Sequence, residues 1–94
     1  MTTITPDLIR NTHKAIAPHT IRTPTVPATR LSLQLGIDLH LKLENRQHTN
    51  AFKSRGALAK LLTLTHAQKQ AGVIACSAGN HAQGVAYHAT RLGI

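Results

Sequence analysis

Two short extended segments, each followed by a helical pattern, constrain the fold of this chain most. Residues 37–43 (IDLHLKL) alternate apolar and polar side chains, which is the period of a half-buried strand. Residues 73–76 (VIAC) are apolar throughout, as in a strand buried on both faces of a parallel sheet. Helical spacing follows each segment, from residue 52 or 53 to 63 and over residues 81–92. The order strand, helix, strand, helix predicts an α/β fold with a doubly wound parallel sheet.

Capping residues and prolines mark the remaining elements. Thr5 followed by Pro6 is a favourable helix start, and Pro18 ends that helix. Two prolines among threonines predict an extended connector over residues 19–27. Further helices are predicted at residues 28–35 and 65–71, closed by Gly36 and Gly72, and Gly93 ends the last helix.

The predicted sheet is too small to be stable by itself. Two parallel strands need neighbouring strands and cover on both faces. The 94 residues are therefore expected to form one incomplete domain, with a helical and extended segment at 1–36 and the strand–helix part at 37–94. Such a chain is expected to be a fragment, or to fold only with a partner.

The formal charge of +8 raises the alternative of an anionic partner such as nucleic acid. However, the eleven Lys and Arg residues are scattered singly along the chain. Phe52 and Tyr87 are the only aromatic residues, so a base-stacking surface is missing, and no nucleic-acid-binding motif is present. Nucleic-acid binding stays a distant alternative, and no such partner is expected.

The cysteine, histidine and hydropathy patterns argue against a disulfide-bonded protein, a metal site and a membrane protein. The single cysteine, Cys76, cannot form a disulfide within the chain, which favours a reducing compartment. The seven histidines lack the spacing of a structural zinc site, so no metal site is expected. The sequence has no membrane-length apolar stretch and no apolar signal core, which predicts a soluble, cytoplasmic protein without a membrane partner.

The first of two motifs places a lysine at the start of a helix. Residues 50–57 read NAFKSRGA, with Lys53 beside Phe52. A cation at the amino end of a helix opposes the helix dipole, so a merely solvated lysine is somewhat disfavoured there. A lysine that reacts as a free amine, as in a Schiff base, suits the position. Alone, this motif is weak evidence.

The second motif is a small-residue turn that leads into a helix. Residues 77–84 read SAGNHAQG, and free backbone N–H groups at such a turn form an anion site. Gly79 permits close backbone approach or a positive φ. Asn80 can cap the helix or bind a ligand oxygen, and Gly84 leaves room for a packed neighbour. From the residues alone, an ordinary strand-to-helix turn is an equally good interpretation.

Together the motifs resemble those of threonine and serine dehydratases, which are fold-type II (tryptophan synthase β-like) pyridoxal-phosphate enzymes. Residues 41–57 resemble the segment around that family's cofactor lysine, and residues 75–85 resemble its asparagine loop. Lys53 and Asn80 lie 27 positions apart, as in the family. The resemblance is strong from residue 41 to residue 93 and general before that. It identifies the chain as an amino-terminal fragment of such an enzyme.

This resemblance implies a site for pyridoxal 5′-phosphate and a small amino-acid substrate. Lys53 is expected to bind the cofactor covalently and to act as general base, Phe52 to pack beside the cofactor, and Asn80 to hydrogen-bond its ring hydroxyl. The residues expected to hold the substrate carboxylate are Ser77, Ala78, Gly79, Asn80 and His81. The implied reaction is the conversion of L-threonine or L-serine to a 2-oxo acid and ammonia, as in isoleucine biosynthesis. The full-length enzyme is expected to be a homo-oligomer.

Three positions depart from relatives of the family. Ala78 stands where serine racemases have a serine that exchanges a proton, which favours dehydration and leaves racemisation as an alternative. Asn50 and Ala51 stand where the family commonly has glycine and serine. Asn50 fits a glycine position because asparagine tolerates positive φ.

Two parts of the family's site have no counterpart in these 94 residues: the glycine-rich phosphate cradle and the contact to the pyridine nitrogen. Catalysis depends on groups held on both sides of the substrate. The chain alone is therefore expected to be inactive or nearly so. A truncated, non-catalytic partner of a full-length dehydratase is the second interpretation.

Overall fold

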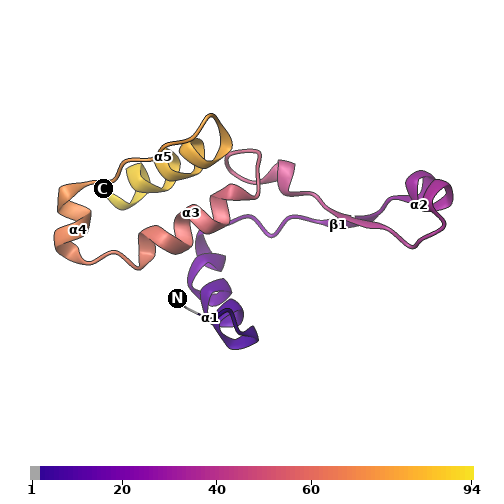
Figure 1. Ribbon diagram of the computed structural model, residues 1–94, viewed down its shortest axis with the longest axis horizontal. Coiled ribbons are helices and arrows are strands. Elements are labelled where there is room, and N and C mark those ends of the chain that lie inside the picture. Colours follow the sequence, from indigo (N-terminus) through magenta and orange to yellow (C-terminus); the bar gives the residue numbers. More distant parts are fainter. Residues whose placement is uncertain (1–2) are drawn as a thin grey trace.

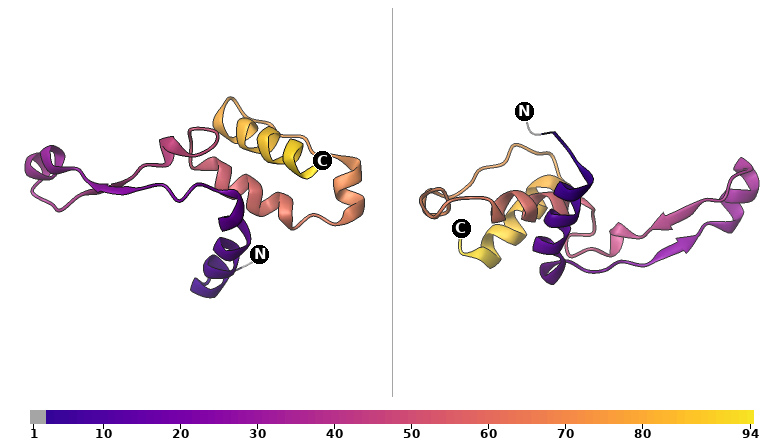
Figure 2. Two further views of the ribbon diagram at one scale, coloured as in Figure 1. Left: turned by 180° about the vertical axis from the view of Figure 1, so that it is seen from behind. Right: turned by 90° about the horizontal axis from the view of Figure 1, so that it is seen from below.

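The computed structural model describes residues 3–94, as a cluster of helices with one projecting arm (Figure 1). The radius of gyration is 16.0 Å and the longest extent is 52 Å. A compact chain of this length has a radius of gyration of about 12 Å. The arm accounts for the elongation, since it points away from the helices in each view of Figures 1 and 2.

Five α-helices, two short strands and two single turns of 3-10 helix follow one another in residues 3–94. They are α1 (Pro6–Ile16), η1 (Ala17–His19), β1 (Thr25–Pro27), α2 (Thr29–Leu35), β2 (His40–Lys42), η2 (Glu44–Arg46), α3 (Lys53–Leu62), α4 (His66–Ala71) and α5 (Asn80–Leu92). The five predicted helices are confirmed, each to within one or two residues. None of the helices in the described part of the chain is long and apolar enough to cross a membrane.

Local side-chain chemistry explains where the helices begin and end. The hydroxyl of Thr5 accepts a backbone N–H of the first turn of α1 at 3.1 Å, and Pro6 takes the first helical position. Gly36 and Gly93 end α2 and α5 at φ of +67° and +69°, in the left-handed region that glycine adopts without a steric penalty. These caps confirm the starts and stops predicted from the sequence.

The core lies between α3 and α5, with α1 packed against α3. Its buried apolar side chains are Ile16, Ala51, Ala57, Leu58, Leu61 and Ala89. Ala86, also on α5, is exposed. Gly84 and His88 are buried instead. The reason is the close approach of α5 to α3 at Gly84, which turns the face of Gly84 and His88 toward α3.

The arm is an antiparallel pair of strands capped by α2, and this corrects the predicted sheet. Thr25 pairs with Lys42 and Pro27 with His40. The predicted extended connector therefore supplies β1, and no parallel pair is formed among residues 3–94. Leu41, expected on a buried face, is 43% exposed. The alternation of residues 37–43 predicts a strand correctly. Leu41 is nevertheless exposed because no helix or further strand of the described residues packs on the β1–β2 pair.

The segment at residues 73–76 is the second correction. The sequence predicts a buried strand there, whereas the structure has no helix or strand at these residues. Val73 is 38% exposed and Ile74 is fully exposed. A strand needs a partner for its backbone groups, and no other strand lies beside this segment in the described residues. The expected division at residue 36 falls at the end of α2 and stays a prediction.

Candidate functional site

Lys53 is the first residue of α3, and its side chain is exposed. The Lys53 Nζ lies 5.1 Å from the centroid of the Phe52 ring, within the range of a cation–π contact. Phe52 is itself 62% exposed. Among residues 3–94 no carboxylate forms a salt bridge with Lys53. An accessible amine and an accessible aromatic ring are therefore presented together at the start of α3.

Gly84 brings the second motif to Lys53. A Cβ at Gly84 would lie 3.4 Å from both the carbonyl carbon and the carbonyl oxygen of Lys53, and 3.3 Å from the Cβ of Ala57. Helices α3 and α5 run side by side in the same direction, so their first turns lie at the same end of the pair (Figures 1 and 2). Gly84 is one turn beyond Asn80. The structure thus places the start of α5, where Asn80 lies, at the same end of the helix pair as Lys53.

The turn before α5 has its own hydrogen bonds. The hydroxyl of Ser77 accepts the N–H of Gly79 at 3.2 Å. Gly79 has φ of −174°, an extended conformation, so the suggested positive φ is wrong for this structure. Gly79 is also the residue that precedes the helix, and no side-chain cap is formed, so Asn80 does not cap α5. Within the described residues the exposed Asn80 side chain forms no hydrogen bond, so its amide is available to a ligand oxygen.

The first N–H groups of α5 are an anion-binding arrangement. Gln83 donates its backbone N–H to the Gly79 carbonyl at 3.2 Å. The N–H groups of Asn80, His81 and Ala82 have no backbone partner within residues 3–94. Such groups at a helix start attract carboxylate or phosphate. The exposed residues of the turn, Ser77 and Ala78, stand directly before them.

An ion pair between Arg55 and Glu44 connects the first turn of α3 to η2. Arg55 donates from both Nε and Nη2 to the Glu44 carboxylate, the second bond at 3.1 Å. Thr23 donates its hydroxyl to the same carboxylate. The hydrogen bonds from Arg55, and with them that from Thr23, outweigh burial and lower the pKa of Glu44 to about 2. Glu44 is therefore ionised at neutral pH and anchors α3 to the start of the arm.

Gln47 and Asn50 shape the loop that leads to Lys53. The Gln47 side chain accepts the N–H of Ile21 at 2.8 Å and donates to the Ile21 carbonyl at 2.9 Å. Gln47 is 2% exposed, so both of these bonds are shielded from water. Asn50 has φ of +55°, which confirms that asparagine takes a glycine-type position here.

A buried hydrogen bond between α3 and α5 is the feature that the sequence reasoning missed. Ser54 Oγ lies 2.7 Å from His88 Nε2, and both residues are 0% exposed. Tyr87 packs edge-on against His88 and stacks on His48, with ring centroids 4.9 and 5.2 Å apart. The sequence feature that indicates the burial of His88 is its position four residues after Gly84, on the same face of the helix.

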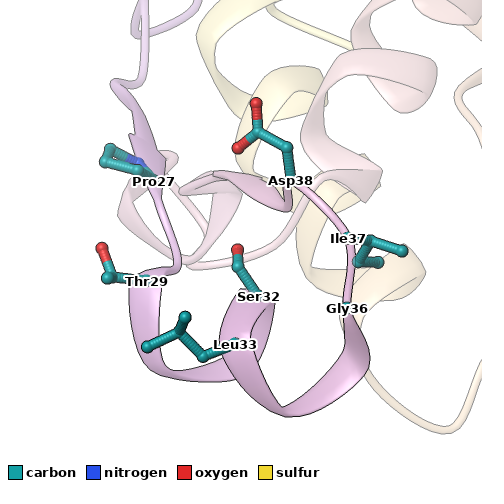
Figure 3. A pocket seen from close by; sticks show the side chains of 7 residues that line it. All are labelled: Pro27, Thr29, Ser32, Leu33, Gly36, Ile37 and Asp38. Carbon is teal, nitrogen blue, oxygen red and sulfur yellow. The ribbon is translucent and has the colours of Figure 1, made fainter.

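Two cavities can be compared with the predicted site residues, and neither is lined by Lys53 or Asn80. One of about 490 Å³ lies on the arm and is lined by residues of α2 and its flanks, including Thr29, Ser32 and Asp38 (Figure 3). A second cavity of about 200 Å³ lies between α3, α5 and residues 73–75, and His81 is part of its wall. His81 is the one member of the predicted turn that borders this second cavity.

Comparison with known proteins gives the family. A family model described as pyridoxal-phosphate dependent enzyme matches residues 16–94. The L-threonine dehydratase catabolic TdcB of Escherichia coli (strain K12) is 58% identical over 57 residues, which are 61% of this chain and 17% of that protein. The protein of the same name from Staphylococcus aureus (strain USA300) is 48% identical over 87 residues, which are 92% of this chain and 25% of that protein. The chain thus spans a quarter or less of the length of these relatives.

Solved structures agree with the sequence relatives. The threonine deaminase of T.th. superposes with a TM-score of 0.83 at 45% identity, covering 97% of this chain and 32% of that one. Maize serine racemase superposes with a TM-score of 0.89 at 38% identity, covering 99% of this chain and 29% of that one. These likenesses confirm the predicted α/β class of fold-type II enzymes.

The residues present fit the cofactor named by the family. An exposed amine, an exposed ring and free helix-start N–H groups lie at one end of the α3–α5 pair. These are groups that can bind an aldehyde, an aromatic ring and an anion. On this geometry and these comparisons, the chain belongs to the pyridoxal-phosphate dependent enzyme family and resembles its threonine dehydratases.

Proposed function

We propose that this chain is the cofactor-lysine part of a longer ammonia-lyase that converts L-threonine, and also L-serine, to a 2-oxo acid and ammonia. The observation that carries the proposal is the contact of Gly84 with the Lys53 backbone, which brings Lys53 and the Asn80 turn to one end of two parallel helices. The names of the sequence relatives, L-threonine dehydratases, support the choice of reaction.

Each candidate residue has a role that its position allows. Lys53 would hold pyridoxal 5′-phosphate covalently, and its amine, once the substrate amine has replaced it, would take the α-proton of the substrate on Nζ. Phe52 packs beside the cofactor ring, and the Asn80 amide binds the ring hydroxyl. The turn from Ser77 to His81, with the free N–H groups at the start of α5, holds the substrate carboxylate. When bound, the cofactor supplies an electron sink for the reaction.

Racemisation is the second candidate reaction, because maize serine racemase superposes on this chain with a TM-score of 0.89. A racemase needs a second group that exchanges a proton on the opposite face of the cofactor. Ala78 has no such group. We therefore favour dehydration.

The site is proposed to work only within a longer, homo-oligomeric cytoplasmic enzyme. The chain spans 25% of the length of the Staphylococcus aureus relative, so most of that relative's residues have no counterpart here. We expect the 94-residue chain alone to bind the cofactor at Lys53 without sustained turnover. Steady production of 2-oxobutanoate from threonine by the purified chain would contradict this expectation.

Reductive trapping tests the role of Lys53. The purified chain is mixed with pyridoxal phosphate, reduced with borohydride, and digested for peptide mass analysis. The five lysines, Lys14, Lys42, Lys53, Lys60 and Lys69, compete for the label. We expect one dominant adduct on Lys53 that disappears in Lys53→Arg and persists in Lys60→Arg, a matched change on the same helix. Equal labelling of all five lysines would overturn the proposal.

A further inference from the structure

We propose that the buried hydrogen bond between Ser54 and His88 positions Lys53 for the cofactor, and that this positioning holds only while His88 is neutral. The inference rests on the proposed function, because it concerns the lysine proposed to carry pyridoxal phosphate. It assigns Ser54 and His88 as positioning residues, since neither is exposed and each acts through the orientation of α3.

Two contacts define how α3 sits against α5. The close approach of Gly84 to the Lys53 carbonyl sets the distance between the helices. The bond from Ser54 Oγ to His88 Nε2, at 2.7 Å, sets the rotation of α3 about its own axis. Successive side chains of a helix are about 100° apart, so the direction of Ser54 fixes the direction of Lys53. Loss of the bond would free Lys53 to swing away from the Asn80 turn.

The environment of His88 selects the neutral ring. His88 Nδ1 is buried and has no hydrogen-bond partner within the described residues. A buried N–H without an acceptor costs more than a buried lone pair without a donor, so the favoured tautomer carries its proton on Nε2 and donates to Ser54. A protonated ring would carry a second N–H at Nδ1 with nothing to accept it.

The charged groups around His88 also favour its neutral form. Burial chiefly, and then the electrostatic effect of Arg91, His48 and His19, lower the pKa of His88 below its ordinary 6.5, while a hydrogen bond to the Ser54 backbone opposes them. Arg91 is on α5, His48 lies in the loop before α3, and His19 is in η1. Tyr87 packs edge-on against His88, and no carboxylate of residues 3–94 is among the groups that shift its pKa.

The lowered pKa of His88 determines how the Ser54–His88 arrangement depends on pH. The folded chain holds His88 with a pKa lower than in the unfolded chain, so the unfolded state binds the proton more readily. The arrangement is fully favoured above pH 6.5 and is lost as the pH falls from 6.5 through the lowered pKa. Lys53 selectivity should therefore decline in that window, while labelling of the four lysines elsewhere serves as an internal reference.

The test uses the 94-residue chain, pyridoxal phosphate and borohydride, with the ratio of label on Lys53 to label on the other lysines as readout. We expect Ser54→Ala to lower this ratio about fivefold at a pH of about 7.5, the factor that corresponds to one hydrogen bond of about 1 kcal/mol. His88→Gln can still donate to Ser54 but cannot titrate, so it should keep the ratio and remove its decline at acid pH. His66→Gln, an exposed histidine on α4, is the matched control and should behave as wild type.

The outcomes separate the two proposals. Unselective labelling of the wild-type chain would overturn both the role of Lys53 and this inference. A selective wild type whose ratio is unchanged in Ser54→Ala would overturn the positioning role alone. If Ser54→Ala loses its helical circular dichroism, the His88→Gln variant is the test. A labelling ratio that stays constant at acid pH in His88→Gln supports the inference. A ratio that declines as in the wild type overturns it.

Discussion

At the scale of single residues, buried polar side chains connect distant segments of this chain more than its few aromatic residues do. Gln47, Ser54 and His88 are each 2% exposed or less, and each bonds a partner far away in the sequence. A buried polar group costs free energy unless it is paired, so these bonds specify one arrangement. Glu44 belongs with them, because it joins Arg55 on α3 to Thr23 before the arm.

Substitution of Glu44 by glutamine tests this ion pair. The pKa of Glu44 is lowered from 4.5 to about 2, chiefly by Arg55, so its stabilising effect is present above pH 4.5 and is lost as the pH falls through about 2. Glu44→Gln should lower the free energy of unfolding by about 1–3 kcal/mol at neutral pH. It should also flatten the dependence of that free energy on pH between 4.5 and 2. Urea unfolding followed by circular dichroism at several pH values measures both effects.

Asp7→Asn is the control for that experiment. Asp7 pairs with Arg10 in a largely exposed contact, with side chains 86% and 69% exposed. Exposed pairs contribute little, so this variant should unfold like the wild type at neutral pH. Equal effects of Asp7→Asn and Glu44→Gln would contradict the special role given to Glu44.

At the scale of elements, the contact of α5 with α3 depends on the absence of a side chain at Gly84. A Cβ there would lie 3.3 Å from Ala57 Cβ and 3.4 Å from the Lys53 carbonyl, whereas a Cβ at Gly56 would meet nothing within 4 Å. Gly84→Val should therefore lower the free energy of unfolding by about 1–3 kcal/mol through overpacking. Gly56→Val, the same change on α3, should alter it by less than about 0.5 kcal/mol. Chemical unfolding of both variants measures the difference, and equal effects would contradict the contact.

The elements also show what the sequence could predict. Caps such as Thr5, Gly36 and Gly93 act within a few residues, so helix ends were predictable from local chemistry. Strand pairing joins distant residues, so the partner of β2 was not predictable from its own alternation. The roles of Lys53 and Asn80 came from a family resemblance and stay predictions, while the structure shows Gly84, one turn beyond Asn80, against the Lys53 carbonyl. His88 was missed because a histidine on an apolar face gives no sequence sign of its buried partner.

At the scale of the whole molecule, apolar surface is unevenly distributed. Leu33 on α2 is 80% exposed and Ile74 is fully exposed, while Leu58 on α3 is 1% exposed. Hydrophobic stabilisation follows the area removed from water, so the arm and residues 73–76 contribute little to it. The helical cluster carries the stability, and the arm extends from it without a covering layer (Figure 2).

This division predicts opposite results for substitutions in the two regions. Leu58→Ala removes a fully packed side chain and should lower the free energy of unfolding by about 2–5 kcal/mol. Leu33→Lys and Ile74→Lys change side chains that already contact water, so each should change the free energy of unfolding by less than about 0.5 kcal/mol. Both Lys variants should also self-associate less than the wild type in sedimentation, because each removes an exposed apolar group. A large loss of stability in Leu33→Lys would mean that the arm packs against the helices in solution, and X-ray scattering would then give a radius of gyration well below 16.0 Å.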